Sequence, residues 1–464
     1  MKLLLSIIPI PQNNLSFPRR RESWLKIPAC AGMTNERILF VSLFLVIGII
    51  SLILIPSIAS AEALTLDKVI KDSLQKNTCI YRVQREYDDK MADATEAKSL
   101  DNPELQIDSD KKKGVSGTGY ATEFTQPLKI SQISGSRADY ADAIAKVADS
   151  EQKYAVLKVI NETTALYTQV WLLSERKKLY ENYADDAEKM KKQVSASAGI
   201  GQTSPAASSL FSADATKLRA DAGAIDAQLR QMRTELARLT GQNYQTAEFA
   251  RPVFAAIPND TDKLDTFAKS RDNLRNIVKS RVQTAERRLS VAQQDAALPE
   301  ISPRLIYSST PNGQGSNEKS YGVGVALRIP LWNQNDTERK RANAELHQAK
   351  SEADLFAGLP QKELIAELQQ SASALQSRSD SYFDTILPSY RKSYSLTRNM
   401  FRAGQVNALE VWQVREKLLD SENEALDAVA QAVNARGALE LELGGKLEEV
   451  RDERLEASDY KNGE

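Results

Sequence analysis

The sequence lacks the residues that most catalytic and metal sites require. Its 464 residues include one histidine, His347, so no second imidazole is present to complete a metal cluster or a catalytic triad. Of the two cysteines, Cys30 falls in a segment that we expect to be removed. Cys79 then has no partner for an internal disulfide. We therefore expect a protein that is not an enzyme and has no cofactor and no metal site.

Aromatic residues are also few, and positive and negative charges almost balance. Phe, Trp and Tyr make up 6% of the chain, and the formal net charge is −1. That balance gives no basic face for nucleic acid, so no nucleic-acid partner is expected. The 42% of hydrophobic and 27% of charged residues are typical of a folded chain, and the abundance of Ala, Leu, Gln, Glu and Lys favours long helices. The predicted fold class is mainly α with a small β part.

The N-terminus carries a targeting signal. Residues 38–55 are apolar or small and uncharged, and Pro56 and Ala59-Ser60-Ala61 follow them. This pattern predicts a secretory signal peptide that is cleaved after Ala61. Residues 1–61 are thus an N-terminal extension and signal peptide, with Met33 as the expected true start. An uncleaved inner-membrane anchor stays open as an alternative, because the run is almost long enough to span a bilayer.

The rest of the chain repeats itself at an interval of about 200 residues. Gln126-Pro127-Leu128 is matched by Ile329-Pro330-Leu331, Gly201-Gln202 by Gly404-Gln405, and Gly241 by Gly444, each 203 residues later. Matches in one order at nearly one spacing indicate a tandem duplication. The predicted boundaries are a first repeat at 62–250, a linker at 251–257, a second repeat at 258–445, and a charged, disordered tail at 446–464.

Each repeat is predicted to run as one helix, two strands, one long helix, a turn and a second long helix. In the second repeat, Tyr321, Val323, Val325 and Leu327 alternate with glycine and alanine, which is the period of a strand with one apolar face. Its partner is expected around 304–310. The first repeat has a weaker version of the pattern at 105–108 and 120–124. The apolar face suits lipid and the small or polar face suits a lumen.

Long amphipathic helices supply the strongest pattern. Apolar residues recur every seven positions in three segments, which predicts coiled-coil packing: Leu166, Leu173, Tyr180, Ala187 and Val194; Phe211, Leu218, Ile225, Met232 and Leu239; and Val411, Leu418, Ala425, Ala432 and Leu439. Nothing interrupts the helix between Ser136 and Val194, so a rod of roughly 90 Å is expected. Each repeat should end in a helical hairpin, with Gly201 and Gly404 at the bends.

Four strands are too few to close a barrel, and open sheet edges are forbidden in lipid. If the strands cross a membrane, several copies must share one barrel. Three copies would give twelve strands and twelve helical rods around one axis. The predicted architecture is therefore a long coiled-coil helical barrel plus a transmembrane β-barrel shared by a trimer, with four strands per chain.

Motifs over nearly the whole mature chain resemble those of the TolC-type outer-membrane efflux proteins. They are "LTLDKVIKDSLQKN", "NPEL", "TQPLKI", "RIPLWNQ" and "FRAGQVNALEVWQVREKLLDSENEAL". "NPEL" and "QPL" look closest to the heavy-metal cation efflux (CzcC-like) branch. The resemblance implies a homotrimeric, passive conduit in the outer membrane, with its helical part in the periplasm. It also implies two partners, a periplasmic adaptor (membrane fusion) protein and an inner-membrane pump of the RND or a similar type.

The resemblance also implies site residues. The adaptor-docking tip falls on Phe401, Arg402, Gly404 and Gln405 in the second repeat and on Gly201 and Gln202 in the first. The first tip lacks the aromatic residue and the arginine, so its contacts depart from the family pattern. Glu410 is the candidate gate, and a helix-capping role is its competing interpretation.

A second class of function stays open from the residues alone. In this alternative the chain is a periplasmic coiled-coil adaptor or scaffold anchored to the inner membrane, and the short strands form a soluble domain. The apolar face from Tyr321 to Leu327 distinguishes the two, because it meets outer-membrane lipid in the conduit and a protein core in the scaffold.

Overall fold

A computed structural model describes residues 63–111, 113, 116–199, 204–297, 299–312, 316–329, 332, 334–358 and 360–450. The chain divides into two units, Met1–Ala61 and Glu62–Glu464. The first unit lies outside the described residues, so the signal peptide and the start at Met33 stay predictions. Everything below concerns the second unit.

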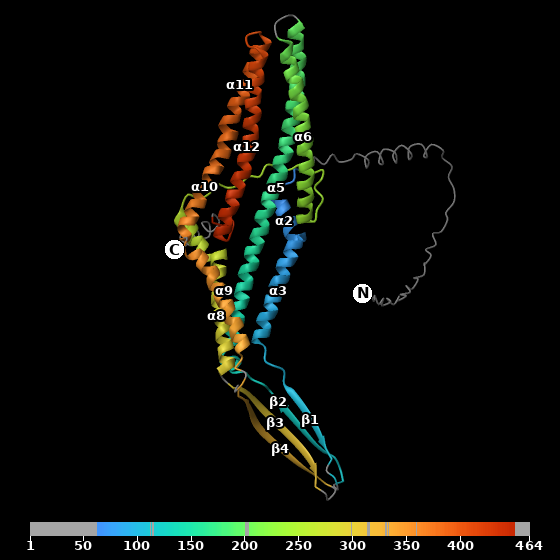
Figure 1. Ribbon diagram of the computed structural model, residues 1–464, viewed down its shortest axis with the longest axis vertical. Coiled ribbons are helices and arrows are strands. Elements are labelled where there is room, and N and C mark those ends of the chain that lie inside the picture. The colour runs from blue at the N-terminus through green and yellow to red at the C-terminus, as the bar shows by residue number, and fades with distance from the viewer. Residues whose placement is uncertain are drawn as a thin grey trace, which may run out of the picture. The chain divides into compact units, whose positions relative to one another are not determined.

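The order of elements repeats along the chain (Figure 1). The first series is α2 (Leu66–Lys76), α3 (Thr78–Lys98), β1 (Glu104–Asp110), β2 (Gly119–Thr125), α4 (Ile130–Ile133), α5 (Ser136–Gly199) and α6 (Pro205–Thr240). The second is α7 (Thr261–Ser270), α8 (Leu274–Ala297), β3 (Glu300–Pro311), β4 (Asn317–Arg328), α9 (Asp336–Ala357), α10 (Gln361–Ser381), the π-helical segment η1 (Tyr382–Ile386), α11 (Leu387–Arg402) and α12 (Ala408–Leu443). Two helices precede each strand pair, where the sequence pattern had predicted one.

The two final helices correspond closely. Both α6 and α12 have 36 residues, and their first residues, Pro205 and Ala408, lie 203 positions apart. Each ends at a glycine in the left-handed region, Gly241 at φ 65° and Gly444 at φ 74°. An L side chain is disfavoured there, so glycine is the residue that ends both helices.

The two long rods differ. α5 runs unbroken for 64 residues, as predicted, because it contains no proline and no internal glycine. Its counterpart in the second repeat was also expected to be one helix, and that expectation is wrong. Gly358 and Pro360 separate α9 from α10, and the π-helical segment precedes Pro388. Proline cannot donate the helical hydrogen bond and crowds the preceding turn, which accounts for a break at the first and a local widening at the second.

The seven-residue patterns lie in the packed interior, as predicted. Every residue of the three series is buried or half-buried, and Ala187, Val194, Phe211, Val411 and Leu439 are fully enclosed. α5 packs along α6, and α12 packs on α10, α11 and α5. The coiled-coil interpretation of these helices is therefore confirmed.

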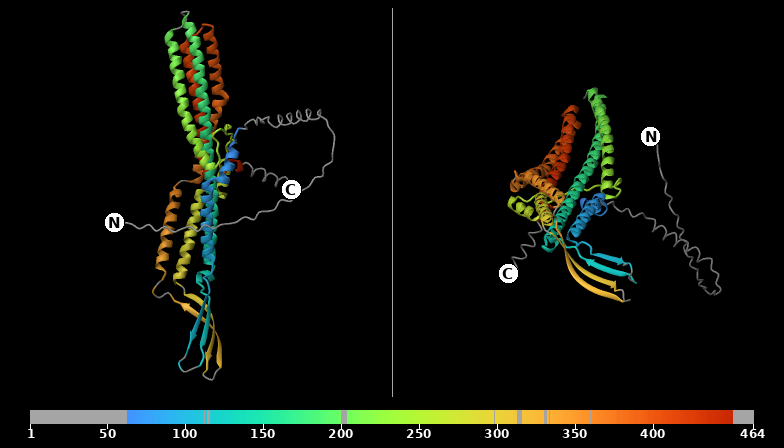
Figure 2. Two further views of the ribbon diagram at one scale, coloured as in Figure 1. Left: turned by 90° about the vertical axis from the view of Figure 1, so that its right-hand side faces the viewer. Right: turned by 60° about the horizontal axis from the view of Figure 1, so that its bottom comes forward.

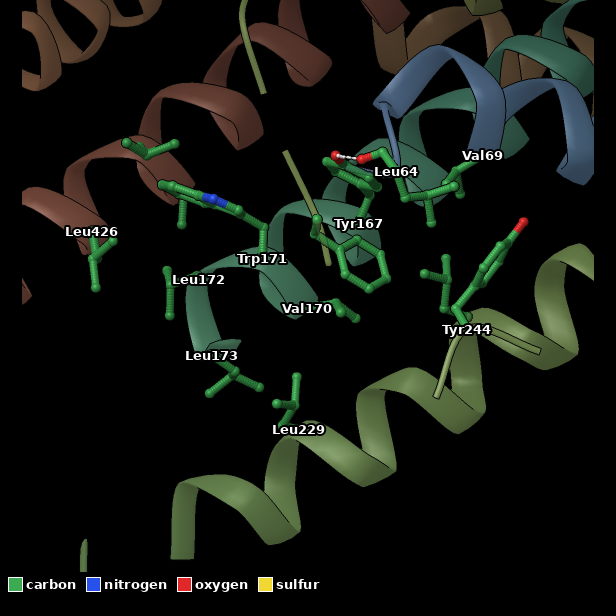
Figure 3. Close-up of a cluster of buried hydrophobic side chains, with 14 of the residues drawn as sticks. Leu64, Val69, Tyr167, Val170, Trp171, Leu172, Leu173, Leu229, Tyr244 and Leu426 are labelled. Carbon is green, nitrogen blue, oxygen red and sulfur yellow. Dashed lines mark hydrogen bonds between the residues drawn. The ribbon is translucent and has the colours of Figure 1, made fainter. Parts of the chain in front are cut away.

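A cluster in the middle of the helices holds the start of the described chain (Figure 3). The backbone of Leu64 forms a parallel bridge with Phe249, which lies just before the linker between the repeats. The hydroxyl of Tyr167 lies 2.6 Å from the carbonyl oxygen of Leu64 and 2.7 Å from that of Ala250. Burial raises the pKa of Tyr167 to about 12, so the phenol keeps the proton with which it donates.

The first residues of the predicted tail, 446–450, are packed against the helices. Leu447 is only 2% exposed and packs beside Leu443 and Phe267. Arg436 pairs with Glu448 at 2.7 Å, so residues 446–450 are held by packing and charge. Residues 451–464 lie outside the described part of the chain.

Among the helices that the structure describes, none combines the length and the apolar character needed to cross a membrane.

Candidate functional site

The four strands form one antiparallel sheet in the order β1-β2-β3-β4. Partners in register share a face of the sheet, so the pairings sort the side chains into rows. One row runs Leu105, Phe124, Leu305, Val323, and the next runs Ile107, Thr122, Tyr307, Tyr321. One face is therefore apolar across all four strands.

That apolar face is uncovered in the single chain. Val323 is 85% exposed and Tyr321 80%, and Val325 and Leu327 are exposed as well. These are the four residues predicted to face lipid. The structure places them together on the open face, and their contact with lipid stays a prediction. An exposed apolar surface of this extent marks an interaction site.

The opposite face is polar or small apart from Ile306. Arg304 pairs with Glu123 at 2.9 Å across two strands, and Ser308 shares a hydrogen bond with Ser320 at 2.7 Å. Gly322 and Gly324 lie on the same face as these residues. The charged and hydroxyl groups of this face suit contact with water. The two glycines add no side-chain bulk to it.

Both outer strands have a free edge. Among the described residues, β1 pairs only with β2 and β4 only with β3, apart from isolated bridges elsewhere. A free edge presents a row of unpaired N–H and C=O groups and pairs readily with another strand. The sheet is therefore incomplete as it stands in one chain.

Four helices continue from the sheet as a wall. α3 packs on α5, α5 on α8 and α8 on α9, and each contact joins antiparallel neighbours. Figures 1 and 2 show these helices side by side between the sheet and the two hairpins, α5/α6 and α11/α12. A groove of about 1330 Å³ runs over the wall and reaches Glu300 and Arg328 at the base of the sheet.

Paired charges line this groove. Glu151 of α5 binds Arg281 of α8 at 2.7 Å and also Lys90 of α3. Arg281 reaches Glu352 of α9 at 3.3 Å. The ion pairs thus join all four helices and give the groove a charged surface. Such a surface is suited to contact with water rather than with apolar side chains.

The tip of the second hairpin ends α11 with a tight backbone motif. Gly404, at φ 70°, donates from its N–H to Phe401 O at 3.0 Å, and the N–H of Gln405 donates to Met400 O at 2.9 Å. These two bonds define the Schellman motif, in which a left-handed residue closes a helix. The predicted role of Gly404 at the bend is confirmed by this geometry.

Phe401 is packed inside the hairpins. It is only 9% exposed and contacts a cluster that includes Phe211 and Val411. The sequence motif had grouped it with docking residues, but its side chain holds the two repeats together. Arg402, Gly404 and Gln405 are exposed, so they are the described members of the predicted tip that a partner could reach. Gly201 and Gln202 lie outside the described residues.

Asn407 caps the start of α12, and Glu410 in the first turn bonds to it. The backbone N–H of Glu410 donates to Asn407 Oδ1 at 2.9 Å, and Asn407 Nδ2 donates to Glu410 Oε1 at 2.8 Å. This reciprocal pair is the capping interpretation that competed with a gating role. The gate assignment stays a prediction, since one chain shows no constriction.

A buried charge cluster near the tips was missed from the sequence. Arg415, only 1% exposed, donates to Asp214 and to the carbonyl of Tyr183, and its Nε lies 3.7 Å from Asp186. Asp186 also accepts from Tyr394. The signal was present, because Arg415 stands between Val411 and Leu418 on the apolar stripe of its helix. Burial, and then the bond to Asp186, raise the pKa of Tyr394, so it keeps its proton.

Within the described part of the chain, no group of His, Cys, Asp and Glu is arranged to hold a metal ion. His347 is exposed on α9.

Residues 268–445 match the family model described as "Outer membrane efflux protein". No similar sequence was found among curated proteins. Solved structures resemble the fold closely. VceC from Vibrio cholerae is 15% identical, with a TM-score of 0.65 over 82% of this chain and 96% of that one. CusC, described as a former of a transmembrane channel, is 15% identical with a TM-score of 0.62 over 82% and 92%. The MtrE outer membrane channel of Neisseria gonorrhoeae is 15% identical with a TM-score of 0.60 over 82% and 89%.

Residues 268–445 carry the family match, and the fold over most of the chain is that of solved outer-membrane channels. The resemblance seen in the sequence motifs is confirmed over these residues. The location in the outer membrane, with the helices in the periplasm, stays a prediction. The heavy-metal branch stays a prediction.

Proposed function

We propose that this chain is the outer-membrane channel subunit of a tripartite efflux system and acts as a passive conduit. Three copies would pair their free β1 and β4 edges and close a twelve-stranded barrel. The helical walls below it would form a tunnel through the periplasm. Energy for transport would come from an inner-membrane pump of the RND or a similar type, linked by a periplasmic adaptor at the hairpin tips.

One observation carries the proposal. A sheet that is apolar on one face, polar on the other and unpaired at both edges continues into a wall that bears a charged groove. Closing the sheet on itself through further copies satisfies both edges at once. It also turns the apolar face toward lipid and the polar face toward water.

The alternative, a periplasmic scaffold, requires a protein core against the apolar face. No described element of this chain covers Val323 or Tyr321. The scaffold would therefore need an unidentified partner over the whole face, and the conduit needs only lipid.

The first experiment is native mass spectrometry of protein extracted in detergent from separated outer membranes. A trimer in that fraction is the expected result. A monomer, or protein found only in the soluble or inner-membrane fraction, would contradict the conduit and favour the scaffold.

The passage itself is tested by conductance of the purified protein in planar bilayers. We expect discrete steps with wild-type protein. A matched control is Val323→Asp, which places a charge on the apolar face and should prevent insertion. Conductance by this variant equal to wild type would contradict the lipid-facing assignment.

Cargo is a separate proposal. The CzcC-like motifs point to divalent metal cations, and a passive duct needs no metal-binding cluster of its own. Deletion of the gene should then raise sensitivity to such cations. Unchanged metal tolerance together with raised sensitivity to organic compounds would contradict a metal cargo and indicate that the channel exports organic compounds.

A further inference from the structure

The helical wall has two free edges, just as the sheet has. Among the described elements, α3 packs along α5 only and α9 along α8 only, apart from minor contacts at the helix ends. The outer faces of α3 and α9 are therefore uncovered. β1 follows α3 and β4 precedes α9, so each free helix edge continues a free strand edge (Figure 1).

One large apolar side chain stands on each free helix edge at the end away from the sheet. Tyr81 of α3 is 65% exposed, and Leu355 of α9 is 76% exposed. α3 starts at Thr78 and α9 ends at Ala357, so both residues lie three or fewer positions from the same end of the wall. Within one chain they cannot meet, because α5 and α8 lie between them.

Charges on the two edges match at the same spacing. Going from Tyr81 toward the sheet, Asp88 and Glu96 follow at seven and fifteen residues. Going from Leu355 toward the sheet, His347 and Lys340 follow at eight and fifteen. All of these side chains are exposed, and neither Glu96 nor Lys340 has an ion-pair partner among the residues that the structure describes. If the two helix edges paired antiparallel, the apolar Tyr81 and Leu355 would meet. The two acidic residues of α3 would then lie beside the histidine and the lysine of α9.

The seam inside each chain supports the same pairing. α5 of the first repeat packs on α8 of the second, and Glu151 binds Arg281 across it. The triplet Arg82-Val83-Gln84 of α3 recurs in α8 as Arg281-Val282-Gln283, 199 residues later, and the repeat interval at α5 and α9 is 203. The positions equivalent to Arg281 and Glu151 are therefore Arg82 on α3 and Asp354 on α9. These two positions carry the same charge signs as Arg281 and Glu151, and both side chains are exposed.

We infer that the α3 edge of one copy docks antiparallel on the α9 edge of the next copy, with Tyr81 against Leu355, Asp88 beside His347 and Glu96 beside Lys340. This register repeats between chains the seam that α5 and α8 form within one chain. The inference rests on the proposed trimer, and it goes further by naming the contact that closes the groove into a tunnel. The partner is a second copy of this chain, chosen by charge complementarity and by continuity with the open sheet edges.

Cysteine cross-linking tests the register. In a background in which Cys30 and Cys79 are replaced by serine, Tyr81→Cys is combined with Leu355→Cys. Oxidation of outer membranes should give covalent trimers on denaturing gels, because any such disulfide joins two chains. The matched control combines Tyr81→Cys with Lys340→Cys. Lys340 lies on the same edge but about 22 Å from Leu355 along the helix, so the control should stay monomeric.

A charge exchange gives a second readout. Lys340→Glu alone should lower the temperature at which the detergent-extracted trimer dissociates, and Glu96→Lys alone should do the same. The double variant should regain the wild-type value, since the pair is restored with its signs reversed.

The outcomes separate the two proposals. A trimer by native mass that gives no Tyr81–Leu355 cross-link, or equal cross-linking in the control, would overturn this register and leave the conduit standing. Additive losses in the charge-exchange variants would also overturn it. A monomeric mass from the outer membrane would instead remove the proposed function on which the register depends.

Discussion

The two repeats keep the same ends and differ in the middle. α6 and α12 have equal length and equivalent left-handed glycine ends, but α5 is one rod of 64 residues and its counterpart is divided into α9, α10, η1 and α11. Helix ends need particular residues, whereas a rod interior needs only an apolar stripe. The two repeats therefore share their hairpin ends, whereas the second rod alone contains Gly358, Pro360 and Pro388.

The largest difference should appear at the buried charge cluster. Arg415 is enclosed and paired with Asp214, while the equivalent residue 203 positions earlier, Ser212, is half-buried. Arg415→Ala should lower the free energy of unfolding by about 3–5 kcal/mol, because it removes a buried guanidinium and leaves the half-buried carboxylate of Asp214 without its ion-pair partner. Ser212→Ala should stay within about 0.5 kcal/mol of wild type. Far-UV circular dichroism during chemical denaturation in detergent measures both. Equal effects would show that the cluster does not stabilise the hairpins.

Next comes the pair of glycines that end α6 and α12. A Cβ on Gly444 would lie 2.7 Å from the backbone nitrogen of Asn273, whereas on Gly241 the nearest atom is the side-chain Cβ of Lys76 at 3.2 Å. Both alanine variants bear the left-handed strain of about 1–2 kcal/mol. Gly444→Ala should lose about 1–3 kcal/mol more, because backbone must shift. The thermal midpoints of the two variants test the ranking, and a smaller loss at Gly444 would contradict it.

At the hairpin tip the effect should be on export more than on stability. Gly404 has nothing within 4 Å of an added Cβ, so Gly404→Val should cost only about 1–2 kcal/mol of strain and leave the trimer assembled. Export should fall, because the bend that presents Arg402 and Gln405 is altered. Native mass spectrometry and a drug or metal accumulation assay on the same strain give the two readouts. Normal export would remove the assignment of this tip.

The smallest effect should be at the break in the second rod, and its sign should be opposite. Gly358 has an ordinary φ of −77° and open space around it. Gly358→Ala should therefore stabilise the protein by about 0.4–1 kcal/mol, through the unfolded chain. A loss of stability in the same denaturation experiment would mean that the break depends on glycine itself.

Local patterns predicted most of the fold. The seven-residue repeats placed the coiled-coil helices, and the alternation at Tyr321–Leu327 placed β4 and its open face. These features depend on residues that are close to one another along the chain, so their spacing can be read from the sequence. Gly358 and Pro360 were visible too, but the symmetry of the repeat favoured an unbroken rod.

The candidate site was less predictable, because it depends on how helices are rotated about their axes. Burial of Phe401 requires Phe211 from the other repeat, and the pairing of Arg281 with both Glu151 and Glu352 requires three helices at fixed angles. No spacing within one element carries that information. Glu410 illustrates the converse, since its capping contact with Asn407 is local and was foreseen.

The pairing of β2 with β3 has a consequence for the order of events during synthesis. Tyr120 lies opposite Ser309, so the centre of the sheet joins residues almost two hundred positions apart. The α5/α6 hairpin can form as soon as it emerges, because its contacts are local. The β1–β2 pair must wait with its apolar side chains and open edge exposed until β3 has been made and brought to it. Closing so long a loop is slow, and a waiting strand pair of this kind is prone to aggregate. Folding of this chain should therefore depend on a periplasmic chaperone that shields residues 104–125 during that interval.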